Sequence, residues 1–160
     1  MRMKNYTILA LLALLLLSSC QKEFNSVYKS TDYRYKYEYA KESYDRGKYQ
    51  RAVTLLQDLI VQMKGSQDAQ DCLHMLGMAE YHSQDYETAA ETFKKYVKSY
   101  PRGDFAEMAS FYTGQSLFMS TPEPRLDQTQ TVSAVEAFQE YLDLYPDARY
   151  KETAQQRLFD

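Results

Sequence analysis

The chain has 160 residues, a length that suits one domain with its own hydrophobic core, and 14% of these residues are aromatic. Its formal net charge at pH 7 is −3, so we expect no basic surface of the kind that binds nucleic acid. The sequence has 16 tyrosines but only two cysteines and two histidines, which leaves few candidates for a disulfide framework or a metal site.

Residues 1–19 have the pattern of a lipoprotein signal peptide. Arg2 and Lys4 give a positive start, and the apolar run over 8–17 that follows is too short to span a bilayer comfortably. The four letters LSSC, which end at Cys20, resemble a bacterial lipobox, in which cleavage leaves an acylated cysteine as the new first residue. We therefore expect Cys20 to carry fatty-acyl chains such as palmitate and to anchor the chain to a membrane. A plain secretory signal that ends near a cysteine is the alternative.

Residues 20–31 are predicted to form a lipidated tether, because their composition is polar with scattered charges. Phe24, Val27 and Tyr28 within it could dock locally. The mature chain would have 141 residues and a formal charge of −5, since two positive charges leave with the signal peptide. Cys72 would then be its one free thiol, and its place in a helical pattern favours a small buried packing residue over a reactive group.

A first helical hairpin is predicted over about 32–65. One helix should run from Asp32, a good N-cap, to Arg46, and a second from Tyr49 to Met63. Gly47 supplies the turn between them, since glycine adopts positive φ without strain. Alternating tyrosines over 33–39 could also indicate a strand, but the helical spacing continues through Tyr44 and favours a helix.

The central hairpin, about 68–101, has the sequence features of a tetratricopeptide repeat. Its first helix carries small and apolar residues at helical spacing, with Gly77 where a partner helix must approach closely. Its second helix alternates aromatic residues with alanine and ends at Pro101, whose ring cannot continue a helix. The first hairpin has a matching pattern 37 residues earlier, with Ala40 in the place of Gly77 and Lys64 in the place of Pro101.

A third hairpin is predicted over about 104–146, capped by Asp104. Gly114 lies 37 residues after Gly77, whereas the second helix is displaced by 45 residues, so eight residues are inserted within 120–130. Two prolines and no apolar periodicity predict a surface loop there. A partial unit over 147–160 carries one last helix, and we expect a longer protein to continue beyond it.

These units predict an all-α fold, a tetratricopeptide-like superhelix of antiparallel helix hairpins over 32–160. We expect no enzyme activity, because no nucleophile elbow, phosphate loop or paired-carboxylate motif is present. His74 and His82 are eight residues apart on one helix, too far for a two-histidine metal site. No catalytic residue, metal, cofactor or small-molecule substrate is therefore expected.

In stacked hairpins the first helices line the inner wall, which is the default binding surface. That wall is rich in aromatic residues and methionine, a composition that suits an extended or helical peptide. The candidate peptide-binding positions are Arg34, Tyr37, Lys41, Tyr44, Asp71, His74, Met78, Tyr81, Met108, Phe111, Gln115 and Phe118. The groove of the first two units is the part expected to bind a partner peptide.

The whole pattern resembles the BamD family, the lipoproteins of the machinery that assembles β-barrels in the outer membrane. The resemblance rests on the run YDRGKYQRAV at 44–53, on two helices ending in Tyr-Pro at 100–101 and 145–146, and on PRLDQT at 124–129. It implies a lipid-anchored adaptor on the periplasmic face of the outer membrane. Its implied partners are a BamA-like barrel protein and unfolded outer-membrane proteins.

This chain departs from the family plan by ending after about three and a half repeats where the family has five. That difference indicates a C-terminally truncated form and puts binding to the barrel protein in doubt. Two other functions remain open. One is a glycan-capturing lipoprotein of an outer-membrane import system, which would need larger insertions than 120–130, and the other is a generic periplasmic scaffold.

Overall fold

The structure is a computed structural model that describes residues 22–66, 68–121 and 128–159. The signal peptide, Cys20 and residues 122–127 of the predicted insertion lie outside the described residues. Within the described ranges every regular element is a helix, which confirms the all-α prediction. None of the helices in these ranges is long and apolar enough to cross a membrane.

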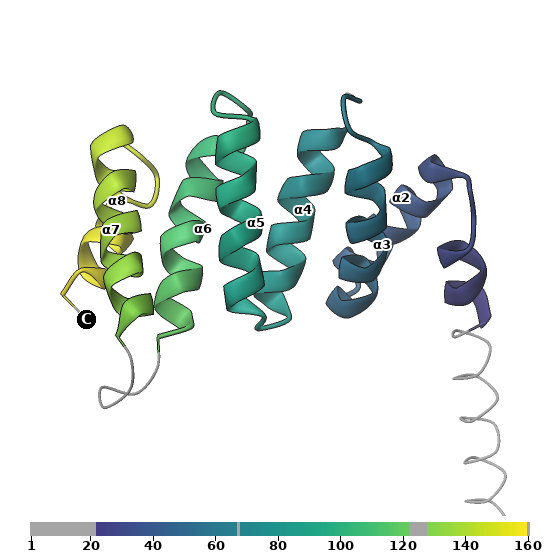
Figure 1. Ribbon diagram of the computed structural model, residues 1–160, viewed down its shortest axis with the longest axis horizontal. Coiled ribbons are helices and arrows are strands. Elements are labelled where there is room, and N and C mark those ends of the chain that lie inside the picture. The colour runs from purple at the N-terminus through teal and green to yellow at the C-terminus, as the bar shows by residue number, and fades with distance from the viewer. Residues whose placement is uncertain (1–21, 67, 122–127, 160) are drawn as a thin grey trace, which may run out of the picture.

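In the described ranges a short helical segment at 22–28 is followed by three antiparallel hairpins and a last helix, and these stand side by side in sequence order (Figure 1). The first helices of the hairpins (A helices) form one layer, and the second helices (B helices) form the layer nearer the viewer of Figure 1. The A helices are α2 (Tyr33–Asp45), α4 (Ala69–His82) and α6 (Ala106–Met119); the B helices are α3 (Tyr49–Gln62), α5 (Tyr86–Ser99) and α7 (Thr129–Leu144); the last helix is α8 (Lys151–Arg157).

The ends of the helices follow from local chemistry. The carboxylate of Asp32 accepts a hydrogen bond from the backbone N–H of Tyr35 at 3.0 Å, which confirms Asp32 as the cap of α2. Gly47 has a φ of 69° in the turn between α2 and α3, as predicted. Gln84, 37 residues later, adopts a φ of 64° at the matching turn. The strand alternative for residues 33–39 is wrong, because α2 covers them.

Glycine lets the two helices of a hairpin approach closely, as Gly77 predicts. A methyl group at Gly77 would lie 2.7 Å from Cε1 of Phe93, and one at Gly114 would lie 2.8 Å from Cδ1 of Phe138. In the first hairpin the smaller Leu56 takes the place of the ring. The array therefore repeats one helix contact with a variable pair of side chains.

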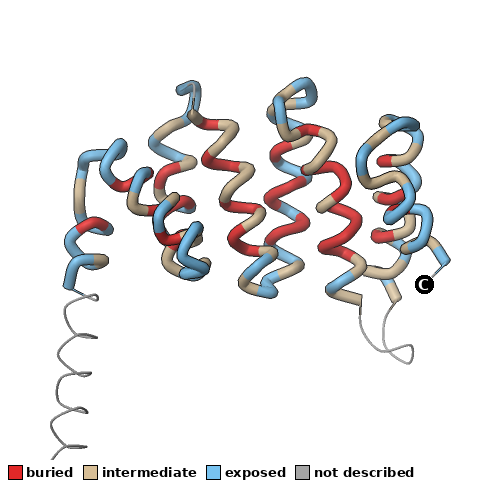
Figure 2. Tube along the Cα trace, turned by 180° about the vertical axis from the view of Figure 1, so that it is seen from behind, coloured by how far each residue is buried: buried red, intermediate tan, exposed pale blue. Residues whose placement is uncertain are grey.

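The core runs through the middle of all the hairpins as a continuous band of buried residues (Figure 2). Residues 22–28 are helical and belong to it, because Val27 is fully buried with Leu56 and Leu59. Phe24 packs against the same cluster, with the Arg51 guanidinium 5.3 Å from its ring. The predicted polar tether thus contains a helical segment that covers the open side of the first hairpin.

The third hairpin differs in detail from its prediction. Phe105, and not Asp104, occupies the N-cap position of α6, and no side chain caps that helix. Helix α7 begins at Thr129, so the last two residues of the predicted loop at 120–130 are helical. The final unit contributes the seven-residue helix α8, which packs Ala154 against the third hairpin.

Candidate functional site

The twelve predicted positions form four rows across the three A helices, because they repeat every 37 residues. The structure divides these rows by depth: some side chains reach the surface and others belong to the interior. The rows are Arg34, Asp71 and Met108; Tyr37, His74 and Phe111; Lys41, Met78 and Gln115; and Tyr44, Tyr81 and Phe118.

The second row packs under the next unit. Tyr37 and Phe111 are only 5% and 4% exposed. The ring of Phe111 stacks on Tyr150 at 4.3 Å between centroids, and the ring of His74 stacks on Phe105 at 4.0 Å. Tyr37 and Phe111 are therefore core residues, and their predicted exposure to a ligand does not agree with the structure.

A repeated tyrosine contact holds the next unit over this row. The hydroxyl of Tyr96 accepts a hydrogen bond from the backbone N–H of Phe105 at 3.2 Å. The hydroxyl of Tyr141 does the same for the N–H of Tyr150 at 3.1 Å and donates to Glu107 at 3.2 Å. Both tyrosines stand five residues before a proline, a spacing in the sequence that could have indicated this contact.

The third row is mixed. Lys41 is partly exposed and pairs with Glu38 at 3.5 Å, and Met78 is partly exposed. Gln115 is only 7% exposed, and its amide nitrogen lies 3.5 Å from the hydroxyl of Tyr81. Gln115 is therefore an interior hydrogen-bonding residue and not part of an open wall.

Tyr44 and Tyr81 of the fourth row belong to a chain of aromatic contacts that joins the three hairpins. The ring of Tyr44 lies 6.1 Å from that of His82, which stacks on Tyr49 at 4.8 Å. Tyr81 lies 5.8 Å from the same histidine and 5.1 Å from Tyr112 of the third hairpin. We call these five residues the aromatic strip; all are half-buried except His82, which is exposed.

Sequence reasoning predicted Tyr44 and Tyr81 but missed His82, Tyr49 and Tyr112. Tyr49 and His82 lie beside the turns and Tyr112 lies in the middle of α6, so only the packing of successive hairpins brings all three rings to the strip. Aromatic residues at both ends of each turn were the available signal. The strip offers ring faces and hydroxyl groups from the C-terminal ends of α2 and α4 to the middle of α6.

The remaining predicted positions lie outside the strip. Arg34 is largely exposed and lies 3.6 Å from the carboxylate of Asp68. Asp71 is partly exposed. Met108 accepts a hydrogen bond from Tyr150 at 3.7 Å, and Phe118 lies under the Arg157 guanidinium at 4.9 Å.

Burial favours the neutral forms of His74 and Cys72. It lowers the pKa of His74 to about 4 and raises the pKa of the Cys72 thiol to about 12. Cys72 is fully buried, as its sequence position predicts. No group of three or more candidate ligands that could hold a metal ion occurs among the residues described. The accessible part of the predicted wall thus presents aromatic rings, hydroxyl groups and a few charged side chains.

Comparison with known proteins adds the family to this geometry. No curated protein matches the chain. Residues 29–160, which include every helix from α2 to α8, match the family described as "YfiO: Outer membrane lipoprotein". Because the match covers more than half of the sequence and the helical repeat array, the chain belongs to the YfiO family of outer membrane lipoproteins.

Proposed function

We propose that this protein is a lipid-anchored adaptor on the periplasmic face of the outer membrane, where it takes part in assembling β-barrel proteins. Membership of an outer membrane lipoprotein family supports the location. The resemblance at 44–53 and the array of hairpins support the role in assembly. Acyl chains on Cys20 would hold the chain at the membrane.

The proposed activity is binding of polypeptide without bond-making chemistry. The observation that carries it is the aromatic strip, which runs without interruption from Tyr44 to Tyr112. Aromatic rings bind peptide side chains at low entropic cost, because each has few rotatable bonds. Lys41 beside the strip offers a charge to a bound segment.

The proposed ligands are segments of unfolded outer-membrane proteins or of a BamA-like barrel protein. A surface of ring faces accepts many side chains, which suits clients that share no single sequence. The buried members of the predicted wall, Tyr37, Phe111 and Gln115, are left out of this surface. An alanine at Tyr37 would remove core volume and would not test binding.

The test is affinity purification of the tagged, full-length lipoprotein from detergent-solubilised membranes, with the captured proteins quantified by mass spectrometry. We expect a barrel-assembly subunit and unfolded outer-membrane proteins to be enriched. The variant Tyr44→Ala should reduce that capture about fivefold or more, since central aromatic contacts commonly contribute over 1 kcal/mol.

The matched control is Tyr35→Ala, which makes the same change on the same helix at a tyrosine that is 48% exposed and outside the strip. It should leave capture unchanged, and thermal unfolding should show that both variants fold. Enrichment of a transporter barrel would instead favour the glycan-import function. Capture of neither barrel protein, or equal losses in both variants, would contradict the proposal.

A further inference from the structure

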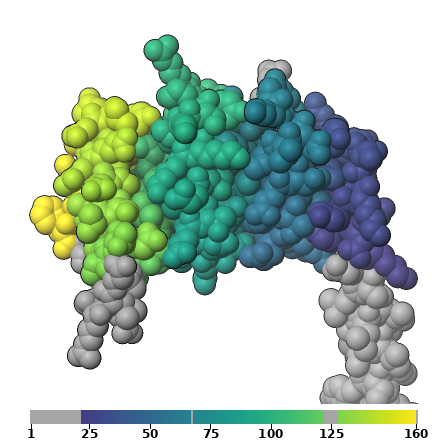
Figure 3. Space-filling model, viewed as in Figure 1, coloured from purple at the N-terminus to yellow at the C-terminus, as the bar shows by residue number. Residues whose placement is uncertain are grey.

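The outer layer carries two grooves at equivalent places in the repeat, each between successive B helices and above an A helix. The groove between α3 and α5 has a volume of about 550 Å³, and the groove between α5 and α7 has about 210 Å³. Figure 3 shows the face on which these B helices lie. We call the larger one the α3/α5 groove. None of the residues that line it belongs to the aromatic strip.

The α3/α5 groove is apolar at its floor and along one wall. Leu73 and Ala69 of α4 form the floor and are 5% and 6% exposed. Ile60 and Val61 of α3 line the wall, and Val61 is 70% exposed to solvent. The floor and this wall together give the groove an apolar lining on one side.

Two lysines stand on opposite walls of this groove. Lys64 follows α3 and Lys95 lies on α5, and neither forms an ion pair with any residue in the described ranges. Burial raises the pKa of Glu80, and the positive charge of Lys95 lowers it by a smaller amount. Glu80 is only 2% exposed, so its carboxyl does not reach the solvent side of the groove. The rim is therefore locally positive on a chain that is acidic overall.

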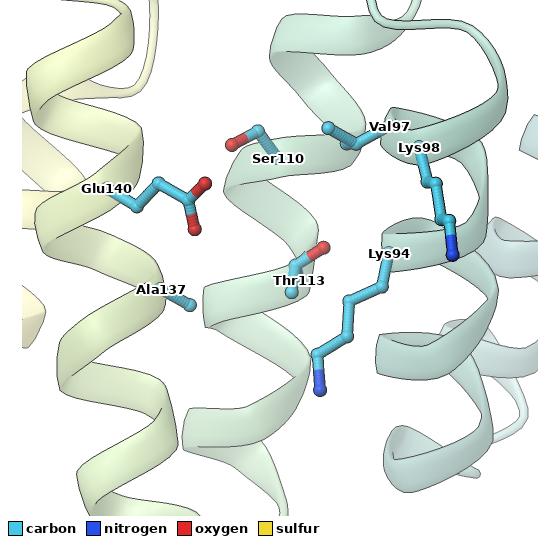
Figure 4. Close-up of a pocket in the computed structure, with 7 residues that line it drawn as sticks. All are labelled: Lys94, Val97, Lys98, Ser110, Thr113, Ala137 and Glu140. Atoms are coloured by element: carbon cyan, nitrogen blue, oxygen red, sulfur yellow. The ribbon is translucent and has the colours of Figure 1, made fainter.

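The smaller groove, at the equivalent position of the next repeat, is lined mainly by polar side chains. Ser110 and Thr113 lie on its floor, and Glu140 faces Lys94 and Lys98 across it (Figure 4). Lys94 is already paired with Glu91 at 2.9 Å. Of the two grooves, only the α3/α5 groove thus combines an apolar floor with lysines on both walls that form no ion pair in the described ranges.

We propose that the α3/α5 groove is a second protein-docking site, which binds an acidic, apolar peptide segment of a partner. An apolar side chain of the segment would cover Leu73 and Val61, and neighbouring carboxylates would pair with Lys64 and Lys95. Charge complementarity of this kind selects the partner and speeds its association. The site does not depend on the proposed binding of clients at the aromatic strip.

The test measures fluorescence anisotropy of a labelled decapeptide in which leucine or phenylalanine alternates with aspartate, titrated with the full-length lipoprotein in detergent. The double variant Lys64→Glu and Lys95→Glu should weaken binding about tenfold. The affinity of the parent should also fall as salt is raised. A peptide with lysine in place of aspartate should bind at least tenfold more weakly than the acidic peptide.

The matched control is the double variant Lys94→Glu and Lys98→Glu, which makes the same charge change in the neighbouring groove. It should alter the affinity less than about twofold. A charge-neutral variant, Ser99→Phe, places a ring in the α3/α5 groove and should block binding while thermal unfolding stays cooperative. These two controls separate occupancy of the groove from a general effect of charge.

Equal losses in the two double variants, or no loss in either, would overturn the proposal. Retained binding by Ser99→Phe would also overturn it. Analytical ultracentrifugation of the parent and of Ser99→Phe tests whether a second copy of the chain occupies this groove. A dimer that Ser99→Phe dissociates would show such occupation and would also overturn the proposal.

Discussion

One position in each A helix sets how closely a hairpin can pack. Gly77 and Gly114 face the rings of Phe93 and Phe138, while Ala40 holds the same register position in the first hairpin. The larger residue on the A helix thus occurs where the B helix carries leucine and not phenylalanine. The two side chains compensate for one another in volume, which close-packed interiors require.

Gly77→Ala is therefore expected to destabilise the fold by about 1–3 kcal/mol, because the new methyl group overpacks against a fully buried ring. Urea unfolding followed by circular dichroism measures the loss. Adding Phe93→Leu recreates the pair of the first hairpin and should recover part of the stability. A double variant no more stable than Gly77→Ala would contradict this explanation.

His74 predicts a dependence of stability on pH. Burial lowers its pKa from 6.5 to about 4, so the unfolded chain binds a proton between these values that the folded chain does not. The contribution of this residue to stability is complete above pH 6.5 and is lost as the pH falls toward 4. His74→Phe keeps a ring against Phe105 and removes the titration.

Urea unfolding of the parent and of His74→Phe at pH 7 and pH 4.5 tests this prediction. The parent should lose more stability than the variant between the two pH values. The same loss in both proteins would show that other groups account for the pH dependence.

At the scale of the element, periodicity predicted most helices because each buries one stripe along its own length. The ends of α2 and α3 fall within one residue of their predicted positions. The helix at 22–28 was missed because one apolar turn has too little period to recognise, and its partner surface exists only once the first hairpin folds. The depth of the predicted wall was missed for a similar reason.

The second row of the predicted wall shows why its burial could not be predicted from the sequence. Tyr37, His74 and Phe111 follow the same spacing as the exposed positions, but for His74 and Phe111 the cover comes from Phe105 and Tyr150 at the start of the next unit. Spacing along one helix cannot show which side chain arrives from another unit. Burial of this row is a property of the array.

Val27 carries a prediction for the N-terminal helical segment. It is fully buried against the first hairpin, so Val27→Ala should lower the free energy of unfolding by roughly 1–3 kcal/mol through loss of apolar contact. Hydrogen exchange should increase first in α2 and α3. Val132→Ala, at a valine that is 56% exposed, is the control and should change stability little.

At the scale of the whole molecule, the proposed anchor links the array to its membrane. Cys20→Ser should prevent incorporation of radiolabelled palmitate and should move the protein from the membrane fraction to the soluble periplasmic fraction. The circular dichroism of the variant should be unchanged, because the described helices begin after this residue. Continued labelling of the variant would contradict lipidation at Cys20.

Site-specific photo-crosslinking can show whether the aromatic strip binds other polypeptides in the cell. A photoreactive phenylalanine analogue replaces Tyr44 in the strip or Tyr35 outside it, and the captured proteins are identified by mass spectrometry. We expect crosslinks from position 44 to segments of outer-membrane proteins or of a barrel-assembly subunit. Position 35 should give few. Equal, unspecific labelling from both positions, or none from position 44, would contradict the proposed binding.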